Sequence, residues 1–210
     1  MFFQRDYVLR MIEMMGDFMR RISELLSDLE RTKLLDDACQ KHTGLSLETA
    51  EALSGESLEE MLSPVPRLMM SELLYIRAES TVLTADQQQK LLLKSLHLLS
   101  SLFREGALCE LRAQRLLTLK KELWPYLREK EFLNCARFFQ EAELYADMED
   151  ALFQAVDLFP KSPQRKELIQ EGLGLLQRAA DANTEALLLA HTSREELLES
   201  AIELQNRTLP

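Results

Sequence analysis

The amino-acid sequence predicts an all-α protein made of helical hairpins and a long N-terminal amphipathic helix. Leu, Ala, Glu, Gln, Lys, Arg and Met dominate the composition, whereas Gly and Pro number only six each. The common residues lose little side-chain freedom in a helix, which favours α over β structure. β-Branched and aromatic residues never alternate over a useful length, so no strand is predicted.

The first segment predicts one long helix over about residues 5–37. From Val8 onward, apolar residues recur every seven positions at three places in the heptad, at offsets of zero, three and four residues, which lie on one face of a helix and make a wide stripe. The opposite side carries charges of both signs. Such a stripe needs a broad surface: the body of its own chain, a second copy or another protein. The candidate partner-binding residues are Val8, Met11, Ile12, Met15, Phe18, Met19 and Ile22.

Residues 43–66 are predicted to form a connector with short helices. Gly44 favours a helix end. Ser46 opens one short helix, and Ser57 with Glu60 forms a capping box for a second. Two prolines, at positions 64 and 66, end that helix because the residue before a proline avoids the helical region.

From residue 67 the pattern predicts a series of hairpins whose short connections make neighbouring helices antiparallel. Ser162 before Pro163 favours a helix start, and Ser193 with Glu196 forms a capping box. The chain thus divides into a long helix (1–42), the connector (43–66) and a hairpin domain (67–210). The expected helices of that domain span about 67–80, 86–103, 107–122, 129–144, 148–158, 163–180, 183–191 and 194–206.

One hairpin has the spacing of a tetratricopeptide repeat, with small residues where two helices cross and bulky residues around them. Met148 departs from this pattern, because a small residue is usual there, and a shift of 34 residues shows no clean second copy. We therefore expect the hairpins to stack as a tetratricopeptide-like array. The residues with this spacing are Phe132, Cys135, Ala136, Phe139, Met148, Leu152, Ala155 and Pro160.

The segments FQRDYVLRMIEMMGDFMRRI and YADMEDALFQAV resemble a family of uncharacterised bacterial proteins with tetratricopeptide-like C-terminal helices. The resemblance covers nearly the whole chain and includes a short opening motif. It implies the same architecture, but it brings no known activity and no catalytic residues. The motif is matched by Phe3, Gln4, Asp6 and Tyr7, with Arg5 interposed.

Charge and cysteine usage exclude several classes of protein. The formal net charge is −10, and the densest basic stretch, 112–121, is interleaved with leucines and predicts one solvated helix face, so we expect no nucleic-acid binding. Cys39, Cys109 and Cys135 stand alone and predict buried thiols in a reducing compartment. Without a membrane-spanning stretch or a signal peptide, the expected location is the cytoplasm.

No pattern predicts a catalytic residue, a metal site or a cofactor. The histidines His42, His97 and His191 are far apart in sequence, and His97 lies among leucines, as a hydrogen-bonded core histidine does. Gly172-Leu173-Gly174 predicts a close approach of another helix, or a kink. The acidic clusters Asp36-Asp37 and Asp147-Glu149-Asp150 predict helix-end stabilisation, the first at the end of one helix and the second at the start of another.

Trp124-Pro125-Tyr126 places two aromatic side chains where the proline ends a helix. Such residues either anchor an interface or close the end of a core. Because they border Leu123 and Leu127, we expect them to close a core.

These observations favour a non-enzymatic protein–protein interaction module whose array or N-terminal stripe binds a protein partner. An acidic surface favours basic or neutral partners, and the stripe could also form a homodimer. One alternative is association of the N-terminal helix with a membrane surface, against which its mixed-charge polar face argues. A second alternative is an enzyme or small-ligand binder whose site is assembled only in the fold.

Overall fold

The computed structural model describes residues 28–207. In this range the chain forms eleven α-helices, one 3-10 helix and no strand, which confirms the all-α prediction. The chain divides into two compact units, residues 1–99 and 100–210, here called unit 1 and unit 2.

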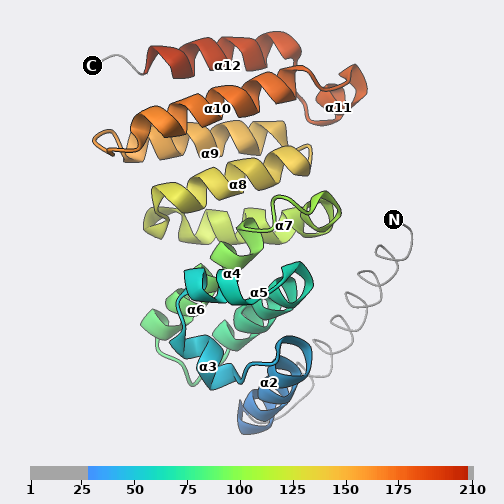
Figure 1. Ribbon diagram of the computed structural model, residues 1–210, viewed down its shortest axis with the longest axis vertical. Coiled ribbons are helices and arrows are strands. Elements are labelled where there is room, and N and C mark those ends of the chain that lie inside the picture. The colour runs from blue at the N-terminus through green and yellow to red at the C-terminus, as the bar shows by residue number, and fades with distance from the viewer. Residues whose placement is uncertain (1–27, 208–210) are drawn as a thin grey trace. The chain divides into compact units, whose positions relative to one another are not determined.

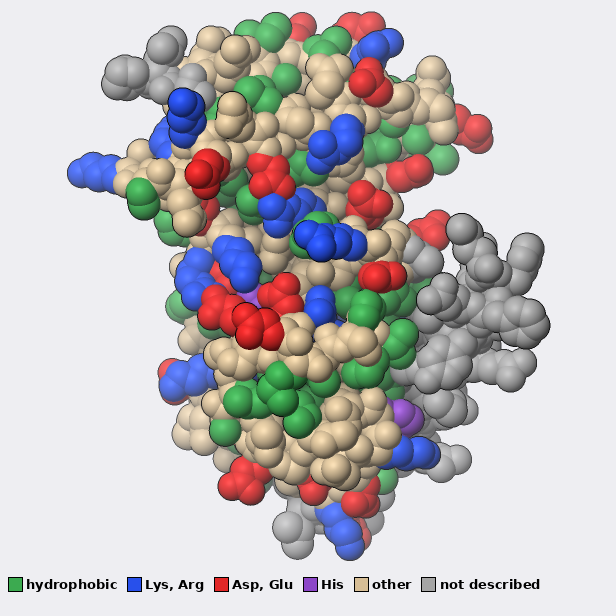
Figure 2. Space-filling view, in the orientation of Figure 1, with side chains coloured by type: hydrophobic (Ala, Val, Ile, Leu, Met, Phe, Trp, Pro, Cys, Tyr) green, Lys and Arg blue, Asp and Glu red, His purple; other side chains and the backbone are tan. Residues whose placement is uncertain are grey.

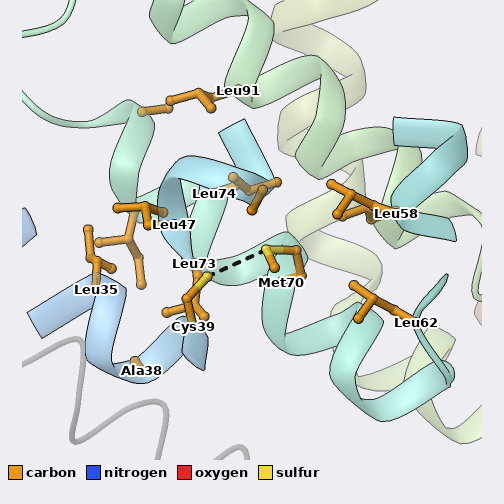
Figure 3. Close-up of a cluster of buried hydrophobic side chains, with 14 residues drawn as sticks. Leu35, Ala38, Cys39, Leu47, Leu58, Leu62, Met70, Leu73, Leu74 and Leu91 are labelled. Atoms are coloured by element: carbon orange, nitrogen blue, oxygen red, sulfur yellow. Dashed lines mark hydrogen bonds between the residues drawn. The ribbon is translucent and has the colours of Figure 1, made fainter. Parts of the chain in front are cut away.

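The described part of unit 1 consists of five helices around one apolar core (Figure 1). Every helix contributes to that core, as Figure 3 shows for Leu35, Leu47, Leu58, Met70 and Leu91. The Cys39 thiol lies 3.7 Å from the Met70 sulfur within it. The helices are α2 (Asp28–Thr43), α3 (Leu47–Ala52), α4 (Gly55–Met61), α5 (Pro64–Ala78) and α6 (Ala85–Ser100).

Helix α2 and the short helix α3 are joined by a tight turn and a side-chain cap. Gly44 has a φ of 76°, a conformation that favours glycine, and it ends α2 as predicted. The Asp36 carboxylate accepts a hydrogen bond of 2.7 Å from the Leu47 amide, the first residue of α3. The predicted helix end at about residue 37 is wrong, because α2 continues to Thr43. Asp36 therefore lies inside α2, not at its end, and stabilises the start of the next helix.

Two other helix starts differ from prediction. The cap of α4 is Ser54, whose hydroxyl accepts a 3.0 Å hydrogen bond from the Ser57 amide, so Ser57 is inside the helix. Helix α5 begins at Pro64, three residues before the predicted start at Arg67. A proline fits there because the first N–H groups of a helix have no partner within it.

Long basic side chains hold the C-terminal ends of α3 and α4. Lys94 on α6 donates to the carbonyl of Ala50 at 3.2 Å and also to that of Glu51. Arg67 on α5 donates to the carbonyls of Glu59 and Leu62 at 2.7 and 2.9 Å. Helices of six and seven residues are too short to be stable alone. These contacts and the burial of Leu47 and Leu58 therefore fix them in unit 1.

Unit 2 contains two closely packed helix pairs. Helix α8 packs against α9, α10 packs against α12, and α10 also contacts both α8 and α9 (Figure 1). The eight helices predicted beyond residue 66 are all present in the two units, with ends shifted by a few residues. The elements of unit 2 are α7 (Gly106–Leu123), the 3-10 helix η1 (Trp124–Tyr126), α8 (Glu129–Glu141), α9 (Tyr145–Leu158), α10 (Arg165–Ala180), α11 (Thr184–Leu189) and α12 (Arg194–Asn206).

Gly172 permits the close approach of three helices in unit 2. A Cβ atom at this position would lie 2.8 Å from a Leu204 methyl group on α12 and 3.3 Å from a Leu152 methyl group on α9. A Cβ at Gly174 would meet only the Arg178 guanidinium, at 3.4 Å. The predicted role of this glycine pair in close packing is therefore confirmed for Gly172 alone.

The last helix, α12, is fastened at both ends. Its start has the predicted capping box, in which Ser193 and Glu196 bond to each other's backbone N–H groups. At its middle the Ser200 hydroxyl donates to Glu149 on α9 at 2.6 Å. Arg207 pairs with Asp157 and lies 4.6 Å from the centre of the Phe153 ring.

Candidate functional site

The predicted partner-binding residues on the N-terminal stripe lie outside the described residues. They are Val8, Met11, Ile12, Met15, Phe18, Met19 and Ile22. The search for a site in the structure therefore concerns residues 28–207.

His97 is a structural residue, as its sequence context predicts. Its side chain is 3% exposed, and its Nε2 atom lies 2.9 Å from the Glu59 carboxylate. Gly55 packs against the ring, since a Cβ there would come within 2.9 Å of a ring carbon. Within residues 28–207, no group of three or more His, Cys, Asp or Glu side chains could hold a metal ion.

The cysteines are buried free thiols, as predicted. Burial is the largest cause that raises the pKa of Cys39, Cys109 and Cys135 to about 12. Because the thiolate is the nucleophile, thiols with such a pKa are unreactive at neutral pH. The arrangement at these three positions suits packing.

The prediction that residues 112–121 form one solvated basic helix face is wrong at Lys120. Its side chain is only 8% exposed, and its ammonium lies 5.9 Å from the centre of the Phe139 ring, while the neighbouring Lys121 is exposed. Burial raises the pKa of Asp147, and the charge of Lys120 opposes that increase. One basic side chain of the stretch thus belongs to the interior of unit 2, because successive residues of a helix point in different directions.

Trp124 and Tyr126 do not close a core, contrary to prediction. Their side chains are 43% and 58% exposed, whereas the flanking Leu123 and Leu127 are buried. The tight 3-10 turn of η1, with Pro125 in it, turns both aromatic side chains outward. The two leucines seal the interior, and the aromatic pair remains on the surface.

A second exposed segment, residues 158–163, lies at the same end of unit 2 as η1. The Ser162 hydroxyl donates to the Glu129 carboxylate at 2.5 Å, which ties the α9–α10 connection to the start of α8. The Phe159 ring meets the Phe132 ring edge to face, with centres 6.4 Å apart. Leu158 is exposed beside these contacts. Ser162 is not the predicted cap of α10, which begins at Arg165.

Exposed lysines lie in the same two segments of unit 2 as these apolar side chains, or directly beside them in the sequence. Figure 2 shows Lys and Arg side chains, with Asp and Glu side chains among them, over the end of unit 2 where the α9–α10 connection and the start of α8 lie. We call this surface the aromatic end. It consists of Trp124, Tyr126 and Leu158 with the exposed lysines Lys121, Lys161 and Lys166.

The other end of unit 2 also exposes apolar residues, but on a less fixed element. Leu188 and Leu189 lie in the last turn of α11, a helix of six residues, and Leu189 is 75% exposed. Leu187 of the same helix is buried. A short helix offers a weaker platform for recognition than η1, which joins two long helices.

Comparison with family models, curated proteins and solved structures gives no match. The resemblance to a bacterial family therefore stays a prediction. Within the described part of the chain, no helix is long and apolar enough to cross a membrane.

Proposed function

We propose that this chain is a non-enzymatic protein–protein interaction module, in which unit 2 is a tetratricopeptide-like pair of hairpins that presents the aromatic end to a partner. The observation that carries the proposal is the exposure of Trp124 and Tyr126. Tryptophan and tyrosine combine a large apolar area with one polar atom, and both are enriched among the residues that dominate binding energy at interfaces.

The packing of unit 2 supports the tetratricopeptide-like architecture. The residues of α8 and α9 that have the repeat spacing are buried, including Phe132, Ala136 and Phe139. Residues of matching character recur 36 positions later as Leu168, Gly172 and Leu175 on α10, all of them buried. An offset of 36 explains why a shift of 34 shows no second copy. In the second pair, α11 lies in the connection between α10 and α12. The second helix of this pair, α12, therefore begins later in the sequence than a 36-residue repeat would place it.

The absence of an enzyme site is part of the proposal and has its own test. It is supported by thiols with a pKa of about 12 and by a histidine bonded within the core. A native-state ligand raises the melting temperature. We expect no shift with pooled divalent metals or common metabolites, and a specific shift of several degrees would favour a ligand site instead.

The N-terminal stripe is a second recognition element in this proposal, supported by its sequence pattern. Its test needs a cut that leaves unit 1 intact. Removal of residues 1–27 keeps α2, whereas a cut beyond Leu35 would remove a fully buried residue of the core. We expect the 28–210 chain to fold, and loss of a partner in that chain would assign the partner to the stripe.

Site-specific crosslinking tests the aromatic end. A photoreactive amino acid at Tyr126 should crosslink a defined partner, and Trp124→Ala should abolish that product. Val82, an exposed apolar residue of unit 1, is the matched control position. The proposal fails if position 126 gives no product, or only products that also form at position 82 and persist in Trp124→Ala.

A further inference from the structure

The aromatic end reverses the charge balance of the protein. Over the whole chain acidic residues outnumber basic ones by 35 to 25. The two segments that build this end, 121–131 and 157–167, carry six basic and five acidic residues. The net charge predicts basic or neutral partners, but recognition depends on the charge at the contact, because salt screens exposed charges beyond about 8 Å.

Most acidic side chains of these segments are engaged within unit 2. Glu131 pairs with Arg128 at 2.6 Å, Glu129 accepts the Ser162 hydroxyl, and Asp157 pairs with Arg207. The two ion pairs balance the charges of Glu131 and Asp157, and the first of them also engages Arg128, while the hydroxyl contact stabilises Glu129 without removing its charge. The remaining two, Glu122 and Glu167, are exposed.

The lysines of the aromatic end have no equivalent role in the fold. Among the described residues, no carboxylate forms an ion pair with Lys121, Lys161 or Lys166. Lys166 also lies in the first turn of α10, where the helix dipole favours an acidic residue. Local stability therefore gives no reason for a cation at this position.

We propose that the aromatic end binds an acidic protein segment with interspersed apolar side chains. The apolar side chains would pack on Trp124, Tyr126 and Leu158, and the carboxylates would face Lys121, Lys161 and Lys166. This inference rests on the proposed function, and it adds the chemical class of the partner. Protein interfaces commonly have apolar side chains at the centre and charged or polar side chains around them.

Other polyanions fit this surface less well. Nucleic acids and anionic membranes present a high density of charge, and their attraction grows with the number of cations in contact. Three exposed lysines on a chain of net charge −10 give a small local attraction against a long-range repulsion. An acidic segment needs few contacts and also gains from the aromatic side chains.

The chain has a built-in reporter for the test, because Trp124 is its only tryptophan. The probe is a synthetic peptide of Glu, Asp and Leu without Trp or Tyr, titrated into the full chain. The control is a peptide in which every Glu and Asp is replaced by Lys. Binding of the acidic peptide should shift the Trp124 emission to shorter wavelength and reduce its quenching by acrylamide. Raising the salt concentration should weaken that binding.

Variants with a labelled acidic peptide separate the two parts of the surface. Trp124→Ala should weaken binding about thirtyfold, as loss of an interface anchor does. The triple reversal Lys121→Glu, Lys161→Glu, Lys166→Glu should weaken it at least about tenfold. The matched controls are Ile202→Ala and Lys33→Glu, at exposed positions outside the aromatic end, and they should bind like the unchanged chain.

Circular dichroism must show an unchanged helical fold for each variant. The inference is overturned if the lysine peptide binds as well as the acidic one, if the triple reversal has no effect, or if the acidic peptide fails to shift Trp124 emission at millimolar concentration. It is also overturned if phosphatidylserine vesicles or poly(A) shift that emission and the acidic peptide does not, or if the chain itself forms a dimer through this end. If one of these results is obtained and a partner is still crosslinked at position 126, the proposed function stands. Only the inference that the partner segment is acidic is then refuted.

Discussion

The two units hold their helices together by different means. Unit 1 contains short helices whose ends depend on charged side chains, with Lys94 and Arg67 donating to carbonyls of α3 and α4. Unit 2 relies on the close approach of long helices, for which Gly172 leaves room. Unit 1 should therefore be sensitive to the loss of polar side chains, and unit 2 to added volume. The buried thiols report on each unit separately, since Cys39 is in unit 1 and Cys135 is in unit 2.

The largest expected effect is that of Gly172→Leu. The new side chain would collide with Leu204 and Leu152 and destabilise unit 2 by about 3 kcal/mol, the upper range for overpacking. Urea-dependent labelling of Cys135 should then occur at lower urea, while labelling of Cys39 changes less. Gly174→Ala is the control and should be neutral or stabilise by up to about 1 kcal/mol, since alanine favours a helix. Equal effects of the two substitutions would contradict the packing described for Gly172.

The next effect is that of Lys94→Met in unit 1. The substitution leaves the carbonyls of Ala50 and Glu51 without their donor, which costs about 2 kcal/mol. Burial lowers the pKa of Lys94, with Glu51 opposing, so removal of the charge recovers part of that cost. Lys90→Met, one turn away on α6, removes an exposed pair with Asp86 and should cost less than about 0.5 kcal/mol. Labelling of Cys39 in urea distinguishes the two, and a similar shift for both would refute the capping role.

The smallest effect is a loss of stability at alkaline pH. Burial raises the pKa of Cys135 from 9.0 to about 12. Above pH 9 the unfolded thiol loses its proton while the native thiol keeps it, so the contribution is full below pH 9 and is lost between pH 9 and 12. From pH 8 to pH 10 the unfolding free energy of unit 2 should fall by about 1 kcal/mol from this thiol. Urea titrations of Cys135→Ala at both pH values should show a smaller fall, and an identical fall would exclude the thiol as its source.

Helix identity was predictable from the sequence because it depends on local pattern. Eight helices beyond residue 66 follow from apolar spacing, and the Ser193–Glu196 capping box follows from residues three apart. Gly44 likewise marks a helix end by its own conformational freedom. Each of these features is decided within a few residues of chain.

The predictions that were wrong fall into two kinds. In one, the residue that determines a side chain's position is distant in the sequence. In the other, two local conformations are close in energy. Asp36 caps a helix that begins eleven residues later, and Lys120 packs near a ring of another helix. Pro64 could equally end one helix or begin the next, and the fold selects the second. For Trp124 and Tyr126 the sequence shows the proline and the flanking leucines, but not the direction in which a 3-10 turn projects its side chains. The lysines of the aromatic end come from two segments that only the folded hairpins bring together.

The fastening of α12 to α9 has a consequence for the order in which unit 2 can form. The contacts of Ser200 with Glu149 and of Arg207 with Asp157 span 51 and 50 residues. During synthesis the chain emerges from its N-terminal side, so α8, α9 and α10 are made before the helix that covers Gly172 with Leu204. Until α12 has been synthesised, the apolar side chains of α9 and α10 that pack against it in the native fold are exposed to solvent. Ribosome-bound chains that end before residue 194 should therefore be the ones most prone to capture by chaperones.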